Sequence, residues 1–469
     1  MPLRPPVPMA PDVRLSARDF LRAVRTNALT MWPKSAYRNP IDVRPFLGRI
    51  NVTLNDPEAI HHVLIGNAAN YRRSPASIRI LRPIAGNGLL LSQGDDWKLQ
   101  RRTIAPALAP RVMPMLTRHV VAAADLAIGR LQAQAGQKID LLTTMQTLAL
   151  DIAGRSMFSL EMEQHGGAMR RLLNEYSIRH SPPHMLDMLL PPSVPTPHDW
   201  GRIRFRRRWL AFMDSIIAHR LAEPLPETPR DLFDLLRAAR DPETGAGFSA
   251  AQLRDQVATL ILAGHETTAV TLFWALIMLA QAPDVQDWLA EEAASVTMEA
   301  DTAFSAMAGL VRTRAVVNET LRLFPPAFTL VREAIAADRI GDLAVPRRSV
   351  VMIAPWVLHR HHTLWQDPDA FLPARFMPDQ PAPGRFTFMP FGAGARICVG
   401  AQFAMAEAIL VLAALVGRFR VTRVDEQPVI PVGIVTTQPD HLAEVFLTDR
   451  TAASARPAAG ARMTETAER

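Results

Sequence analysis

Apolar residues recur at helical spacing through much of the chain, and several of these stretches have recognisable ends. Ser249 followed by Gln252 has the form of a capping box, in which each side chain satisfies a free backbone N–H at a helix start. The helical pattern continues to about Gln281, and at ~1.5 Å per residue this predicts a helix roughly 45–50 Å long. A helix of that length crosses a whole domain.

Prolines and capping residues predict three further helix boundaries. Asp56 before Pro57 predicts a helix start, because aspartate is a good N-cap and proline suits the first turn. A second long helix is expected over 303–323, ended by the proline pair that begins at Pro325. A third is expected over 398–419. Helical spacing of apolar residues is therefore the main pattern in this chain.

Short segments that read as strands are fewer than the helical ones. They lie near residues 47–54, 328–335, 349–353 and 429–446. The predicted fold class is therefore mostly α with a small β region. We expect a Pro-rich lead-in over residues 1–13, a single domain over 14–449, and a disordered Ala-rich tail over 450–469.

Composition places the chain among ordinary globular proteins. It has 469 residues, of which 48% are hydrophobic and 21% charged. No run reaches the roughly 18 uninterrupted apolar residues of a membrane span, and the first residues lack the apolar core of a signal peptide. With one cysteine, Cys398, no internal disulfide can form. We expect a cytoplasmic protein without a transmembrane anchor.

The chain is basic, with a net charge of +7. Almost all of the basic residues are arginines, and the densest run comprises Arg202, Arg204, Arg206, Arg207 and Arg208. At helical spacing this run predicts one solvated face of an amphipathic helix. No nucleic-acid-binding motif accompanies it, so we do not expect nucleic acid as a partner.

A lone cysteine is most often a small buried hydrophobe, so its neighbours decide how Cys398 is interpreted. A thiol at a helix start meets the positive end of the helix dipole, which favours the thiolate. The backbone N–H groups of Val399 and Gly400 are expected to point at the sulfur, since such donors lack partners within the helix. These features suit a cysteine that is a metal ligand.

The residues just before the cysteine suit a flat, acidic ligand. Gly392 and Gly394 permit a tight hairpin that brings the backbone close to such a ligand. Arg396 offers a charge-assisted hydrogen bond to a carboxylate at its edge. Haem carries two propionates, and a thiolate is one of its axial ligands in proteins.

This segment, FGAGARICVG, resembles the haem-binding loop of the cytochrome P-450 family, F-x-x-G-x-R-x-C-x-G, at every fixed position. The resemblance implies the cytochrome P-450 fold, a single domain with haem b between the 249–281 helix and the cysteine loop. It also implies that Cys398 is the iron ligand, and that Phe391, Gly392 and Arg396 contact the haem.

Other motifs of that family stand in the expected order. Glu319 and Arg322 resemble its E-x-x-R pair, and their i, i+3 spacing puts both on one helix face. Arg375, after Ala374 where the family often has Glu, resembles the third member of a structural charged cluster. Trp97 and Arg101, in WKLQR, and Arg332 resemble positions that donate to the haem propionates. By themselves, these charged residues would be surface groups of little energetic weight.

The central helix carries the sequence AGHETT from Ala263 to Thr268, which resembles the family's oxygen-activating signature. Gly264 weakens a helix interior, and a threonine there can bond back to the i−4 carbonyl and loosen the ladder. The resemblance makes Thr267 the residue beside bound O₂ and Glu266 its acidic neighbour. We expect an unsatisfied Thr267 hydroxyl to donate a proton that Glu266 replaces. Thr268 is the alternative donor.

Four apolar positions resemble the family's substrate-facing sites: Leu90, Ala263, Ala327 and Phe328. An apolar pocket favours a lipophilic small molecule. The chain has no second cysteine for an iron–sulfur cluster and no appended flavin domain. Electrons are therefore expected from a separate ferredoxin or flavodoxin with its reductase, docking near Lys98 and Arg102, and we expect a monomer.

The implied activity is that of a monooxygenase, which inserts one oxygen atom of O₂ into the substrate. Two alternatives stay open at this point: a peroxide-driven or non-oxygenating haem-thiolate enzyme, and a non-enzymatic haem-binding protein. Turnover with a reductase and NAD(P)H, turnover with peroxide, or no turnover distinguishes the three.

Overall fold

A long helix, α11 (Ala250–Gln281), forms the centre of the computed structural model, which describes residues 2–46, 48–160 and 165–450. Ser249 and Gln252 form the predicted capping box: each side chain accepts a hydrogen bond from the other's backbone N–H. Every residue from Thr268 to Leu279 is buried. Because a helix that is apolar on all sides must be covered on all sides, the other helices pack around this half of α11.

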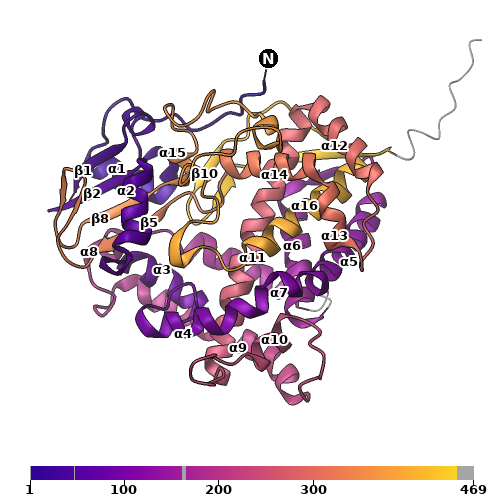
Figure 1. Cartoon of the computed structure of the whole chain (residues 1–469), viewed down its shortest axis with the longest axis horizontal. Helices are drawn as coiled ribbons and strands as arrows, with labels where there is room; N and C mark the ends of the chain where they lie inside the picture. Colours follow the sequence, from indigo (N-terminus) through magenta and orange to yellow (C-terminus); the bar gives the residue numbers. More distant parts are fainter. Residues whose placement is uncertain (1, 47, 161–164, 451–469) are drawn as a thin grey trace, which may run out of the picture.

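Figure 1 shows α11 crossing the middle of the molecule, between a strand-rich part and a part made of helices. The helices of ten or more residues are α1 (Ala17–Thr26), α3 (Pro75–Ala85), α4 (Gly94–Ile104), α5 (Met113–Gln132), α6 (Leu141–Phe158), α7 (Gly166–Glu175), α9 (Pro197–Ala222), α12 (Pro283–Ser295), α14 (Val311–Leu323) and α16 (Ala401–Arg418). The shorter ones are α2 (Pro57–His61), α8 (Met185–Leu189), α10 (Leu232–Ala238), α13 (Ala303–Ala306) and α15 (Pro355–Leu358).

Within the described residues, the β region consists of one larger sheet and three small ones. The five-stranded sheet has the order β1 (Ile41–Phe46), β2 (Arg49–Leu54), β8 (Val350–Ile353), β5 (Leu330–Ala334) and β3 (Tyr71–Arg73). Its β2–β8 pair is parallel and the others are antiparallel. The small sheets pair β4 (Lys138–Asp140) with β12 (Glu444–Asp449) and β9 (Phe419–Arg423), β6 (Asp338–Ile340) with β7 (Leu343–Val345), and β10 (Pro431–Gly433) with β11 (Thr437–Pro439). The predicted fold class, mostly α with a small β region, is confirmed.

Two of the predicted helices differ from the structure, one in its continuity and one in its start. The helix expected over 303–323 is interrupted: α13 ends at Ala306, and α14 begins at Val311 after a non-helical Leu310. The helix expected from Cys398 begins at Ala401, with Gly400 as its N-cap. The start at Asp56 is confirmed, because its carboxylate accepts from the Ala59 N–H.

The arginine run of α9 is not one solvated face, and this prediction was wrong for Arg202. Its buried guanidinium donates to both carboxylate oxygens of Asp187 on α8, at 2.7 and 2.9 Å. Arg204, Arg207 and Arg208 are exposed. A period-3.6 pattern places residues on helix faces, but it does not show where another chain segment covers the polar face.

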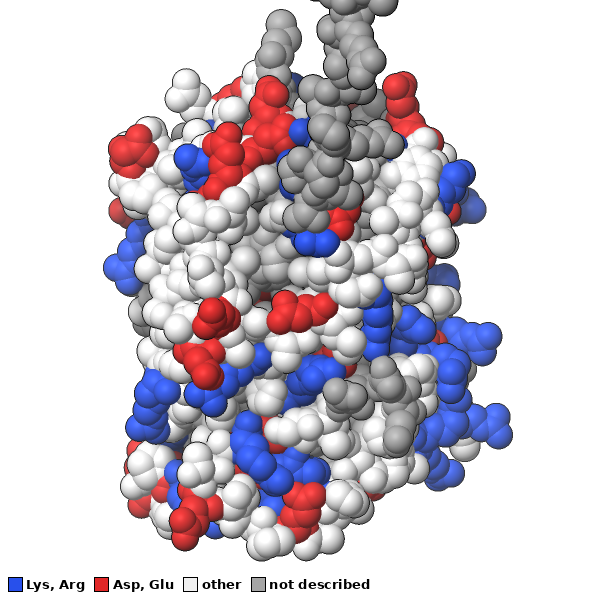
Figure 2. Space-filling view, turned by 90° about the vertical axis from the view of Figure 1, so that its right-hand side faces the viewer, with Lys and Arg blue, Asp and Glu red and all other residues white. Residues whose placement is uncertain are grey.

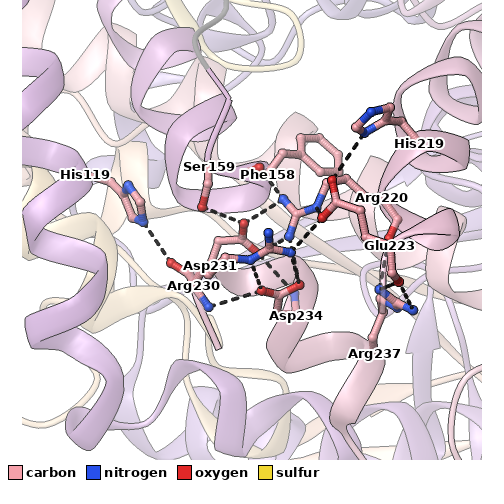
Figure 3. Close-up of polar contacts among 10 residues, drawn as sticks. All are labelled: His119, Phe158, Ser159, His219, Arg220, Glu223, Arg230, Asp231, Asp234 and Arg237. Atoms are coloured by element: carbon pink, nitrogen blue, oxygen red, sulfur yellow. Dashed lines mark hydrogen bonds and ion pairs between the residues drawn. The ribbon is translucent and has the colours of Figure 1, made fainter. Parts of the chain in front are cut away.

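The other end of α9 is held by a second buried ion cluster, drawn in Figure 3. Arg220 donates to Asp231 at 2.7 Å and to Asp234 at 2.8 Å, and all three side chains are almost fully buried. Arg230 also donates to Asp234, and hydrogen bonds from Arg230 hold the pKa of that carboxyl below its usual value despite its burial. Both ends of α9 are therefore fastened by paired, hydrogen-bonded charges.

By length and apolar composition, three of the described helical segments would suffice to cross a membrane: residues 110–132, α11 and α16. In α11 and α16, 72% and 56% of the most apolar window is buried inside the fold. Packing in the core therefore accounts for much of their hydropathy. The predicted tail lies outside the described residues except for Arg450. The predicted lead-in runs without helix or strand, and its Leu3 carbonyl accepts from the Phe371 N–H.

Candidate functional site

The loop that carries the only cysteine is a compact hairpin. The Cys398 N–H donates to the Phe391 carbonyl at 2.9 Å, and the Ile397 N–H donates to the Gly394 carbonyl at 3.1 Å. Gly392 and Gly394 both have φ of +72°, the left-handed region that favours glycine. A Cβ at Gly394 would lie 2.3 Å from the Leu64 carbonyl oxygen. The hairpin therefore requires the glycines on which the sequence analysis relied.

The Cys398 thiol is open to solvent on one side and enclosed by protein elsewhere. Burial raises the pKa of the thiol above its usual value, although the Gly400 N–H and Arg101 act in the opposite direction. The Gly400 N–H lowers the thiol pKa, as a donor near a helix start is expected to do, but burial outweighs it. Coordination to a metal ion deprotonates a cysteine outright, so a raised thiol pKa is compatible with a ligand role.

Three arginines gather beside this loop without a carboxylate. Arg73 on β3 pairs directly with Arg332 on β5, and the charges of Arg332 and Arg396 both lower the pKa of Arg73. Burial is the main cause of these shifts, which bring the pKa of Arg73 to about 9 and that of Arg396 to about 10. Among the described residues, none of the three forms an ion pair, and the Arg73 Nε is a buried donor without a partner.

Arg332 is buried, and Arg73 and Arg396 are partly buried. Cations withdrawn from water without an anion are expensive, so this cluster indicates that a ligand supplies the negative charge. Arg332 and Arg396 were predicted from the sequence, whereas Arg73 was not. Only the strand register shows that Arg73 belongs with them.

Trp97 and Arg101 of α4 also meet the cysteine loop. Arg101 donates to the Ile397 carbonyl at 2.9 Å, and the Arg396 guanidinium lies 4.4 Å from the centre of the Trp97 ring. The Arg396 side chain donates to the Ser92 carbonyl as well. The Trp97 indole N–H has no hydrogen-bond partner among the described residues, so it remains free to donate to a ligand.

These groups fit haem. The thiol suits an axial ligand of its iron, and the unpaired arginines with the Trp97 N–H suit its two propionates. The donor set holds only groups that give hydrogen bonds, as carboxylates require. The fit rests on the buried, unpaired arginines, which no protein group among the described residues neutralises.

The oxygen-activating signature lies on a side of α11 that is accessible at Ala263 and half-buried at Thr267. The Thr267 hydroxyl donates back to the Ala263 carbonyl at 2.6 Å. This hydrogen bond to the i−4 carbonyl was expected from the sequence. It also means that the Thr267 hydroxyl already has an acceptor, whereas we expected it to have none. Glu266 is turned towards Thr436 and Gln438, which both donate to its carboxylate, and burial raises its pKa.

A second acidic group near α11 was not anticipated. Glu407 on α16 is buried, and its carboxyl accepts a hydrogen bond from the Thr268 hydroxyl at 3.1 Å. Burial raises the pKa of Glu407 to about 8. A charged residue within the apolar run AMAEAILVLAALV was a signal in the sequence, because such a residue needs a buried partner.

The charged cluster is buried and closely bonded. Arg322 donates to both carboxylate oxygens of Glu319, at 2.7 and 2.8 Å, and to three backbone carbonyls, those of His359, Pro368 and Ala370. Arg375 donates to the same carboxylate at 3.2 Å. Ala374, where the family often has Glu, takes no part in these contacts.

A cavity of about 640 Å³ lies between the five-stranded sheet, α1, α3 and the segment 181–192. Of the four predicted substrate-facing residues, Ala327 and Phe328 line this cavity, whereas Leu90 and Ala263 are not among its lining residues. Most of its other lining side chains are apolar.

The two cations expected to dock an electron donor are not free. Lys98 pairs with Asp95 at 2.9 Å, and Arg102 pairs with the buried Asp241 at 3.0 Å and with Glu243 at 3.0 Å. Their positive charge is therefore locally neutralised. These ion pairs count against a basic docking patch at Lys98 and Arg102, which stays a prediction, since charge in sequence does not reveal its ion-pair partners.

Fold and site together define a helical haem-thiolate protein, and comparisons with known proteins agree. The cytochrome P-450 family model matches residues 45–444. Cyclooctatin synthase of Streptomyces melanosporofaciens is 32% identical and covers 78% of this chain and 79% of its own length. Pentalenene oxygenase of Streptomyces avermitilis is 30% identical, covering 79% and 82%. The solved cytochrome P450DA heme domain shares the fold, with a TM-score of 0.76, 23% identity and coverage of 88% and 90%.

The chain belongs to the cytochrome P-450 family. It is an oxidoreductase, a haem-thiolate monooxygenase, as the relatives named as oxygenases and monooxygenases support.

Proposed function

We propose that the Cys398 sulfur would bind the iron of haem b, and that Arg73, Arg332 and Arg396 would hold its propionates. The observation that carries this proposal is the group of buried and partly buried arginines without a carboxylate, beside a hairpin that presents the only thiol. Trp97 and Arg101 complete the donor set and fix the loop from α4. Phe391 and Gly392 shape the turn before the thiol.

When bound, haem supplies the activation of O₂ and its insertion into the substrate. The protein's part is to exclude water, to hold a lipophilic substrate and to deliver protons. We propose that Thr267 delivers them through its hydroxyl, and that Glu266 replaces each proton. Because burial raises the pKa of Glu266, its carboxyl holds a proton more readily than usual. Its side chain must leave Thr436 and Gln438 to reach Thr267.

The substrate is proposed to be a lipophilic small molecule, and the electron source a separate ferredoxin or flavodoxin with its reductase. The names of cyclooctatin synthase and pentalenene oxygenase support a small organic substrate. The apolar walls of the cavity support a lipophilic one. Cytoplasmic location and a monomeric state stay predictions from the sequence.

The ligand assignment is tested by the spectrum of the reduced, CO-bound protein. Thiolate-ligated haem should absorb near ~450 nm, and Cys398→Ala should abolish that band, because no other thiol exists. Ile397→Val is the matched control, since that side chain is exposed beside the cysteine and should leave the band unchanged. A Cys398→Ala protein that keeps the band contradicts the assignment.

A further inference from the structure

One wall of the cavity is a single face of the five-stranded sheet. Asn51 on β2 pairs with Val350 on β8, Val350 pairs with Glu333 on β5, and Glu333 pairs with Arg72 on β3. Directly paired residues project from the same face of a sheet, and all four line the cavity. This wall therefore continues across four strands, and its outer part is polar.

Asn51 is the unusual member of that wall. The residue is only 7% exposed and lines the cavity, and no described residue forms a hydrogen bond with its amide. The amide atoms are not among the fully buried groups without a partner, so they are open to the cavity. The Asn51 amide is therefore available to donate to a polar group on a molecule that fills the cavity.

Positive charge surrounds the same part of the wall. Arg49 and Arg72 share one carboxylate, Glu333, at 3.6 and 3.0 Å. Arg348 also lines the cavity and forms no ion pair among the described residues. Arg49 and Arg348 each lie two residues before the paired Asn51 and Val350, Arg348 in the turn that precedes β8. Three arginines thus line this part of the cavity with one carboxylate, so the rim carries a net positive charge.

The backbone at Arg348 reinforces this interpretation. Its φ is +68°, in the left-handed region that a long side chain such as arginine seldom adopts. The conformation is held by the Arg348 N–H donating to the Ala334 carbonyl at 2.8 Å. Strained residues of this kind cluster where a ligand is held.

The opposite end of the cavity is apolar and lies near Phe328. Glu333 on β5 lies five positions after Phe328, and an extended chain at ~3.3 Å per residue spans about 16 Å over that stretch. Met352, Val331 and Val350 cover the sheet face between the two ends. The cavity therefore suits a long molecule with a polar end and an apolar body.

We propose that the substrate is an amphiphilic carboxylic acid, whose carboxylate is bound by Asn51, Arg49 and Arg348 at the rim of the sheet. The inference rests on the proposed function, because it assumes that this cavity admits the molecule to be oxygenated. It further places the oxygen on the apolar body, at the end remote from the carboxylate. Arg49, Asn51 and Arg348 then determine specificity without contacting the reacting atom.

The test is spectral titration of the ferric holoenzyme with two matched pairs: myristic acid with myristyl alcohol, and abietic acid with abietyl alcohol. The linear and polycyclic bodies separate the effect of shape from that of the carboxylate. We expect at least one acid to bind about tenfold to a hundredfold more tightly than its alcohol, the range for hydrogen bonds to a charged group. Arg348→Gln and Asn51→Asp should remove this preference and leave alcohol binding unchanged.

Arg347→Gln is the matched control, because Arg347 is an exposed arginine next in sequence that does not line the cavity. It should keep the preference for the acid. If neither acid binds more tightly than its alcohol, or if Arg348→Gln and Asn51→Asp keep the preference, the inference is wrong. An enzyme that retains the ~450 nm band while failing this test rejects the inference alone, whereas loss of the band rejects the proposed function.

Discussion

Thr267 and Thr268 are adjacent in sequence, but their hydroxyls have different partners. Thr267 bonds back to Ala263 on the accessible side of α11, whereas Thr268 is buried and donates to Glu407. One residue further along a helix lies about 100° further around it, so only one of the two can face the same ligand. The accessible position of Thr267 supports the proposal that this residue, and not Thr268, delivers the protons.

Thr267→Ala should therefore uncouple the enzyme. Haem and substrate binding should stay nearly intact, while product formed per NAD(P)H oxidised should fall steeply, because positioned proton transfer contributes about 10²–10⁴-fold. The measurement is the ratio of product to NAD(P)H consumed, with peroxide assayed alongside. Thr268→Ala is the matched control. If Thr267→Ala forms as much product per NAD(P)H as the natural enzyme and Thr268→Ala forms less, then Thr268 delivers the protons. If both variants keep the natural ratio, neither threonine of this helix delivers protons.

At the scale of elements, α11 and α16 meet through the buried Glu407 carboxyl. Burial raises its pKa from 4.5 to about 8, so the folded protein holds a proton that the unfolded chain releases. For an acid shifted in this direction, stability is greatest below the unfolded pKa and declines as pH rises towards the folded one. The α11–α16 contact should therefore weaken between about pH 4.5 and pH 8.

Glu407→Gln should remove that decline, because the amide has no proton to lose. Relative to the natural chain, the variant should gain stability between about pH 6 and about pH 9, by on the order of 1–3 kcal/mol. Urea midpoints at the two pH values measure the gain. Glu291→Gln, an exposed carboxylate on α12, should show no such change. If the variant and the natural chain differ in stability by the same amount at both pH values, the pKa of Glu407 is not raised in the folded protein.

For the molecule as a whole, the net charge of +7 is the feature that bears on an electron donor. Figure 2 shows basic side chains gathered over the lower half and right-hand edge of one face, interspersed with acidic groups. Electrostatic attraction between oppositely charged proteins mainly raises the association rate, and salt screens it. An acidic ferredoxin or flavodoxin is thus the expected donor.

The rate of reduction by such a donor should fall as ionic strength rises. Lys98→Gln and Arg102→Gln should each change that rate by no more than about twofold, because both cations are already paired with carboxylates. Stopped-flow reduction at several salt concentrations measures both effects. A rate independent of salt would contradict electrostatic steering, and a large loss in either variant would restore the docking site expected from the sequence.

Features that depend on neighbouring residues were predictable from the sequence. The capping box at Ser249, the glycines of the cysteine hairpin and the back-bond of Thr267 each involve groups within a few positions, where backbone geometry alone brings them together. The resemblance to the P-450 family added Glu319, Arg322 and Arg375, whose contacts span a longer stretch of chain.

Features that join distant segments were decided by the tertiary structure. The pairing of β3 with β5 puts Arg73 beside Arg332, and helix packing puts Glu407 against Thr268. The partners of Arg202 and Arg102, and the solitary Asn51 amide in the cavity wall, depend equally on which segments meet. One sequence carries no pairwise distances. Residues become buried only when the strands and helices have packed. The shifted pKa values and the polar groups without a hydrogen-bond partner follow from that burial.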